Sequence, residues 1–169
     1  MPSTLIKTLF VLFLTLPLTG QIASAATLER VDVVESGTFR IETGVATAKA
    51  NTPTGEVTAV DRAVLIEATD TVEARKGTEF GFRYTIVGEP EGDEVELDIV
   101  ITYPEAGLSD PATGKSVHES RYSTTKKIGA TEYLGYGIEA EWEAVPGPWS
   151  FEIWHEGAQL ARLVFTVTQ

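Results

Sequence analysis

Three glutamates near the C-terminal end of the chain are the first group whose spacing could support chemistry. Glu139, Glu141 and Glu143 occupy alternate positions, so a strand would place their carboxylates on one face, about 6–7 Å apart. Glycosidases use carboxylate pairs about 5–10 Å apart. An acid catalyst also needs a raised pKa, and the surrounding sequence indicates no burial that would raise one. We therefore interpret the three as a solvated strand face whose charge discourages pairing with other strands.

Imidazole and metal chemistry have few candidate residues. The chain has two histidines, His118 and His155, no Gly-x-Ser-x-Gly elbow and no cysteine. Both histidines lie in polar segments typical of solvent-facing side chains. Two distant histidines make a poor zinc or copper site, and no Asp-x-Asp-x-Asp-Gly loop indicates calcium. We expect no catalytic residue, no cofactor and no metal, and hence a protein that is not an enzyme.

Trp154 is the aromatic residue whose position in the strand pattern does not fit a core. Trp149, Phe151 and Ile153 alternate and are expected to face inward, which turns Trp154 outward beside Glu152. An exposed tryptophan can anchor a partner or stack on a sugar ring. We assign a speculative partner-binding surface to Trp154, Glu139 and Glu141. The alternative is that the loop at 48–56 or an adjacent strand covers Trp154.

The first 25 residues have the pattern of a secretory signal. Lys7 is the one charged side chain before an apolar run at 9–18, and a small-x-small site follows at Ala23-Ser24-Ala25. A membrane anchor needs about 20 apolar residues, twice what the run offers. The pattern predicts cleavage after Ala25, a mature N-terminus at Ala26 and a periplasmic or secreted protein. Lipid attachment is excluded because no cysteine is present.

The remaining 144 of the 169 residues are the length of one domain, which we place at 26–169. Without Lys7 the chain has 12 basic and 25 acidic residues, a net charge of −13. That charge repels nucleic acid and anionic lipid surfaces. No second apolar stretch is long enough for stable membrane insertion. The absence of cysteine excludes thiol nucleophiles, cysteine-ligated zinc and iron–sulfur clusters.

Period-2 alternation between turn signals predicts an all-β protein. We expect an antiparallel immunoglobulin-like β-sandwich of about 7–9 strands, and its segments are 31–34, 39–45, 64–72, 80–86, 95–103, 117–125, 136–142, 149–154 and 161–167. Turn residues at 35–37 separate the first two, and long loops are expected at 48–56 and 104–115. The polar segment 117–125 is expected at a sheet edge. Predicted core residues are Phe82, Tyr84, Leu97, Ile99, Trp149, Phe151, Ile153, Leu163, Phe165 and Val167.

The Pro146-Gly147-Pro148 segment predicts a turn before the last hairpin. Neither proline can donate a ladder hydrogen bond, so the segment does not fit within a central strand. Gly147 is free to take the positive φ that a type II turn after Pro146 requires.

Several motifs in a fixed order carry a family resemblance. They are Gly77-Thr78-x-Phe80-Gly81-Phe82, Gly88-x-Pro90-x-Gly92, Tyr103-Pro104-x-x-Gly107-Leu108 and Trp142-Glu143-x-x-Pro146-Gly147-x-Trp149-x-Phe151-x-Ile153, closing with Phe165-x-Val167. With this order the chain, from about Val33 to its C-terminus, resembles DUF3859, a bacterial domain family of unknown function. The resemblance implies no activity, cofactor or catalytic residue.

The sequence favours an exported, non-catalytic binding module of the bacterial cell envelope. Such a module would present the loops at 48–56 and 104–116 to an unknown protein or polymer of the envelope. Two alternatives are a glycosidase-like hydrolase that uses the Glu139, Glu141 and Glu143 ridge, and a passive structural protein of the envelope.

Overall fold

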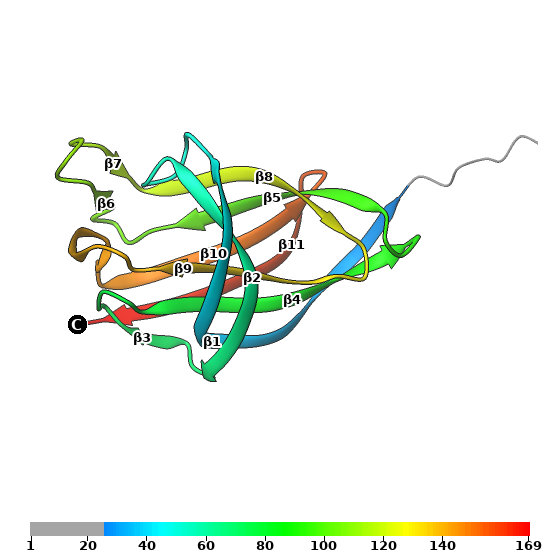
Figure 1. The fold of residues 1–169 in the computed structure, drawn as a ribbon, viewed down its shortest axis with the longest axis horizontal. Helices are drawn as coiled ribbons and strands as arrows, with labels where there is room; N and C mark the ends of the chain where they lie inside the picture. The colour runs from blue at the N-terminus through cyan, green and yellow to red at the C-terminus, as the bar shows by residue number, and fades with distance from the viewer. Residues whose placement is uncertain (1–25) are drawn as a thin grey trace, which may run out of the picture.

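The structure is a computed structural model that describes residues 26–169, so the predicted signal segment at 1–25 lies outside the described residues. Two sheets face each other (Figure 1). One has the order β2-β1-β4-β9 and the other the order β3-β11-β10-β5-β8. The strands of the first are β1 (Thr27–Ala48), β2 (Glu56–Glu67), β4 (Glu79–Glu89) and β9 (Thr131–Gly137). Those of the second are β3 (Thr71–Glu73), β5 (Glu94–Thr102), β8 (Glu119–Lys127), β10 (Gly147–His155) and β11 (Ala158–Thr168).

The smaller elements lie in the connections. The strands β6 (Leu108–Ser109) and β7 (Ser116–Val117) form a two-stranded ribbon within the long loop before β8. A single 3-10 turn, η1 (Glu141–Glu143), follows β9. The described residues thus form eleven strands, three of them only two or three residues long, against the expected 7–9. All pairings are antiparallel except that of β3 with β11, which is parallel.

Alternating apolar residues on the inner faces of both sheets build the core. Phe80 on β4 packs edge-on against Trp149 and Phe151 on β10, with ring centroids 5.5 and 5.7 Å apart. Nine of the ten predicted core residues are buried, and Leu163 is half-buried against the same cluster. Val100 is buried although it points away from this core, as expected for a strand covered on both faces.

β1 is one strand of 22 residues, which corrects the expected turn at 35–37. Its first half pairs with β4, and from Thr38 onward its second half pairs with β2. Gly37 allows this change of partner, because a Cβ there would lie 1.8 Å from the carbonyl oxygen of Glu67. The chain therefore stays extended, and the hairpin at 41–60, here called the arm, crosses over the sandwich (Figure 1).

Other boundaries differ from the expected ones in smaller ways. The segment 64–72 is divided between the end of β2 and the short strand β3. The turn between β1 and β2 lies at 49–55, and β8 is an edge strand, both as expected. No helix among residues 26–169 has the length and apolar character needed to cross a bilayer.

Gly147 takes a positive φ of 132°, which confirms the expected positive φ but not the type II turn, whose third residue has φ near +80°. Gly147 is the first residue of β10 and pairs with Val167. The ring of Pro104 lies close to Gly147, and a Cβ at Gly147 would be 2.9 Å from the Cβ of Pro104.

Candidate functional site

A cavity of about 610 Å³ lies between the two sheets on the side covered by the arm. Its walls come from the two edge strands, β8 of one sheet and β9 of the other, together with inner residues of β4 and β5. The arm contributes Ile41, Thr47, Val57 and Thr58. A volume of this size falls in the range of small-molecule binding sites.

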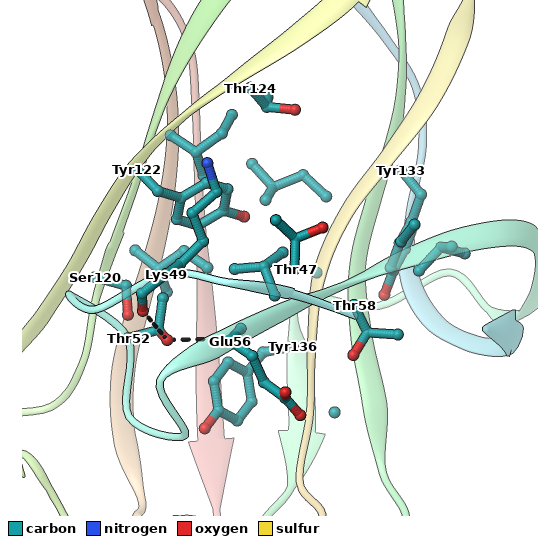
Figure 2. Close-up of a pocket in the computed structure, with 18 of the residues that line it drawn as sticks. Thr47, Lys49, Thr52, Glu56, Thr58, Ser120, Tyr122, Thr124, Tyr133 and Tyr136 are labelled. Carbon is teal, nitrogen blue, oxygen red and sulfur yellow. Dashed lines mark hydrogen bonds between the residues drawn. The ribbon is translucent and has the colours of Figure 1, made fainter. Parts of the chain in front are cut away.

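All five tyrosines of the chain line this one cavity, and they are Tyr84, Tyr103, Tyr122, Tyr133 and Tyr136. They come from four places in the sequence: β4, the end of β5, β8 and β9. Figure 2 shows Tyr122 and Tyr133 on opposite sides of the cavity with Tyr136 near one end. The cavity therefore combines aromatic faces with hydroxyl groups.

Three of the tyrosine hydroxyls have protein partners. Tyr133 donates to Glu79 at 2.8 Å, Tyr136 donates to Glu143 at 2.8 Å, and Tyr103 pairs with Ser120 at 2.5 Å. These bonds fix the orientation of the three tyrosine rings.

The hydroxyls of Tyr84 and Tyr122 have no hydrogen-bond partner among residues 26–169. Tyr84 as a whole is only 1% exposed. Among residues 26–169, however, every side-chain oxygen or nitrogen atom that is fully enclosed has a hydrogen-bond partner. The free hydroxyl of Tyr84 must therefore reach the cavity space. Burial raises the pKa of Tyr122 to about 12 and that of Tyr84 above its usual range, so both are protonated donors at neutral pH.

Glu79 is the carboxyl of the cavity with the most altered titration. Burial raises the pKa of Glu79 to about 7; the hydrogen bond from Tyr133 lowers it, and the nearby charge of Glu139 raises it. Close to neutral pH this carboxyl therefore exchanges between its neutral and charged forms. Only its Oε1 atom is bonded to Tyr133.

Glu143 organises the chain after β9. It is 2% exposed, and its carboxylate accepts hydrogen bonds from Tyr136 and from the backbone N–H groups of Glu139 and Ala140, at 2.7 and 2.8 Å. Capture of these two N–H groups ends the extended chain at Gly137 and produces η1. The expected strand at 136–142 and the expected ridge of three carboxylates on one face are therefore wrong: Glu143 points inward while Glu139 and Glu141 are exposed.

The two lysines of the lining are both engaged. Lys49, at the tip of the arm, donates to the carbonyl oxygen of Ser123 at 2.8 Å, and its Nζ lies 6.0 Å from the centre of the Tyr122 ring. Lys126 forms an ion pair with Glu132 at 2.5 Å. The lining contains six glutamates against these two lysines, and they are Glu56, Glu79, Glu96, Glu132, Glu139 and Glu143.

The sequence profile of the family described as Domain of unknown function (DUF3859) matches residues 28–167. The chain belongs to the DUF3859 family. The crystal structure of an immunoglobulin-like protein from Pseudomonas aeruginosa is similar to the fold of this DUF3859 member, with a TM-score of 0.56 and 23% sequence identity over 83% of this chain and 98% of the other. This likeness supports the immunoglobulin-like sandwich expected from the sequence. No curated protein matches the sequence.

In this DUF3859 chain the three residues of the speculative partner surface are placed differently from one another. Glu139 lines the cavity, whereas Glu141 and Trp154 do not. Trp154 is half-buried on β10 beyond a bulge, and its indole N–H donates to Glu152 at 2.8 Å. This bond satisfies the polar end of the tryptophan.

The histidines of this DUF3859 member also lie outside the cavity lining. His118 is exposed, as expected, and its backbone carbonyl accepts the N–H of Tyr103. His155 is half-buried, and its Nδ1 lies 2.8 Å from the carbonyl oxygen of Glu96. Residues 26–169 contain no group of three or more side chains placed to hold a metal ion.

Sequence reasoning missed the cavity residues although one signal was present. Ser120, Tyr122 and Thr124 alternate on the polar strand β8 and all three line the cavity. Hydroxyl-bearing side chains on an inward face indicate a wet space where a core would be apolar. Tyr84, in contrast, was expected in the core; it lies there and also lines the cavity.

Proposed function

We propose that this protein is exported and acts as a non-catalytic binding module of the bacterial cell envelope, with the tyrosine-lined cavity as its ligand site. The observation that carries the proposal is the cavity itself, where two tyrosine hydroxyls lack partners among the described residues. A ligand with polar groups would supply those partners and would bury its apolar parts against the rings.

Export is inferred from the sequence at 1–25, which has the charge, the apolar run and the small-x-small site of a cleaved signal. An exported protein would lie in the periplasm or outside the cell. The net charge of −12 for the full chain disfavours nucleic acid and anionic lipid as partners. The proposed partner is a component of the envelope, protein or polymer.

The non-catalytic part of the proposal has its own support. A hydrolase on the Glu139, Glu141 and Glu143 ridge would need carboxylates that share one face, and Glu143 is instead buried with three hydrogen bonds. Both histidines lie outside the cavity lining. A passive structural role would leave the cavity without a ligand, and this difference can be tested.

The test is photo-crosslinking in the native envelope. A photoreactive amino acid replaces Thr58, which lines the cavity from the exposed arm (Figure 2), and in a matched control it replaces Thr166, exposed on β11. We expect an adduct of discrete mass at position 58 that is absent at position 166. The additional change Thr124→Trp, which fills the cavity from β8, should remove that adduct. Crosslinks within the chain alone at both positions would favour the passive structural role.

A further inference from the structure

We infer that the cavity selects an organic cation, an amine-bearing ligand with apolar segments between its charges. This inference rests on the proposed binding function of the same cavity and adds the chemical class of its ligand. Charge, aromatic surface, free hydroxyls and one titrating carboxyl support it.

The charge of the lining favours a cation. Lys126 is paired with Glu132, and Lys49 donates to the neutral Ser123 carbonyl and forms no ion pair. Six glutamates against two lysines leave the lining with an excess of negative charge. Among residues 26–169, Glu132 is the one lining glutamate with a basic partner. The other five have none, and they are Glu56, Glu79, Glu96, Glu139 and Glu143. An anionic ligand would enter against this field, whereas an amine would be attracted by it.

The aromatic surface of the cavity already accommodates an ammonium group. The Nζ of Lys49 lies over the Tyr122 ring, 6.0 Å from its centre, while donating to the Ser123 carbonyl. The face of a tyrosine ring attracts cations through its negative quadrupole. Tyr133 stands on the opposite side of the cavity (Figure 2), and its hydroxyl is held by Glu79. A second ammonium on that side would meet both an aromatic ring and a carboxyl group.

The free hydroxyls suit the ligand's N–H groups. Tyr84 and Tyr122 come from opposite sheets and line the same cavity. Burial is the main cause of the raised pKa of Tyr84, and Tyr122 contributes to it. A hydroxyl oxygen accepts a hydrogen bond from an ammonium and can also donate one. A neutral saccharide would use the same hydroxyls and rings, so charge is the property that separates the two ligand classes.

Glu79 couples binding to protonation. The groups that act on it are the Tyr133 hydroxyl from β9 and the Glu139 carboxylate beyond β9. A cation beside Glu79 favours its charged form, so binding should release a proton below about pH 7. Affinity for an amine should therefore rise as the pH increases through this range.

The experiment is calorimetric titration of the exported protein with spermidine, with cellobiose as a neutral probe and citrate as an anionic probe. We expect spermidine to bind and the other two probes not to bind. The affinity for spermidine should rise about tenfold between pH 5.5 and 8, because binding should lower the pKa of Glu79 by one unit or more. Sodium chloride should weaken binding at the exposed mouth. Glu79→Gln should remove most of the pH dependence, and Tyr122→Leu should weaken binding at all pH values.

Matched controls separate site binding from general attraction to an acidic protein. Glu105→Gln removes one exposed carboxylate outside the cavity lining and should leave the spermidine affinity and its pH dependence unchanged. Melting temperatures of all variants establish that the fold is intact. Equal weakening by Glu105→Gln and Glu79→Gln would overturn the inference, because the attraction would then be non-specific.

The outcomes also distinguish this inference from the proposed function. Cellobiose binding without spermidine binding would overturn the cationic class and leave a binding module in place. If spermidine does not bind but an adduct forms at position 58 in the envelope, the cationic class is likewise overturned and the binding module stands. Failure of every probe together with no adduct would overturn both.

Discussion

Glu79 and Gly147 are the single residues whose surroundings most change their ordinary behaviour. Glu79 is a carboxyl that burial keeps neutral to an unusually high pH, and Tyr133 is its hydrogen-bond donor. Gly147 holds a backbone conformation and a close contact that a side chain would not tolerate. Each gives a prediction that one substitution can test.

Glu79 should titrate with a midpoint near pH 7 in the unliganded protein, which carboxyl carbon NMR can measure directly. Tyr133→Phe should raise the midpoint further, because the lost hydrogen bond favoured the charged form. The pKa of Glu79 is higher in the folded than in the unfolded protein, so between about pH 4.5 and 7 the folded protein keeps a proton that the unfolded chain loses. The free energy of unfolding therefore falls as the pH rises through this range.

Replacing Glu79 by Gln removes this titration, so the free energy of unfolding of the variant, relative to wild type, should increase by about 2–3 kcal/mol between pH 5 and 8. Urea unfolding at the two pH values measures it. A parallel pH dependence for both proteins would show that Glu79 titrates at its ordinary value.

Gly147→Val should destabilise the fold by roughly 2–4 kcal/mol, because valine adds both backbone strain and a clash to this position. The clash is with Pro104, whose Cβ would lie 2.9 Å from the new Cβ. Gly114→Val is the matched control, since Gly114 also has positive φ but nothing lies within 4 Å of its Cβ position. Spermidine binding below the melting transition should be retained. Wild-type stability with a selective loss of binding would make this segment a recognition site instead.

Two hairpins have contrasting roles in the molecule. The β10–β11 hairpin is central to the core, with Phe165 against Phe80 and Phe151. The arm lies over the cavity and is held to the body by a few polar contacts, in which Lys115 donates to the carbonyls of Ala50 and Thr52 at 3.1 and 2.8 Å. Stability therefore depends on the first hairpin, and access to the cavity depends on the second.

Phe165→Ala should reduce the free energy of unfolding by about 3–5 kcal/mol, the usual cost of truncating a buried aromatic. Urea unfolding measures the loss. Val164→Ala on the same strand is the control, because Val164 is 43% exposed and its truncation should cost less than about 1 kcal/mol. Equal effects of the two substitutions would show that the closing strand is not packed as described.

Lys115→Met should loosen the tip of the arm, since it removes both charge-assisted bonds to the backbone of Ala50 and Thr52. Hydrogen exchange of the amides at 49–56 should become about three- to tenfold faster, as expected for the loss of about 1 kcal/mol. Lys127→Met, an exposed position at the end of β8, should leave these rates unchanged. Unchanged exchange in Lys115→Met would assign the arm's position to Lys49 and to strand pairing alone.

At the scale of the whole molecule, an acidic composition accompanies a sandwich without cysteine, and both are compatible with the proposed export. The 25 acidic residues outnumber the 13 basic ones, which favours solubility and attracts cations over the entire surface. The cavity would concentrate that general preference at one position.

The exported protein should begin at Ala26, because Ala23-Ser24-Ala25 supplies the small residues that a signal peptidase requires. Intact-mass measurement of protein recovered from the envelope fraction checks this directly. An N-terminus elsewhere would show that the cleavage site was wrongly assigned, and recovery of the uncleaved chain with the membrane would favour an anchor.

The sequence by itself determined the elements whose pattern is local. Alternation of Phe80, Phe82 and Tyr84, or of Trp149, Phe151 and Ile153, indicates a strand with one buried face whatever it packs against. The family resemblance and the predicted core followed from such segments, and both are confirmed.

Only the tertiary structure decided the continuity of β1, the turn after β9 and the cavity. In sequence Gly37 resembles a turn residue. In the structure it lies within a strand, and the absence of a Cβ allows the backbone of Glu67 on β2 to lie close to it. Glu143 belongs to an alternating acidic series, yet its carboxylate gains three hydrogen bonds by turning inward. The cavity depends on tyrosines that lie far apart along the chain, and their meeting is set by how the two sheets and the arm enclose a common space, which no local pattern encodes.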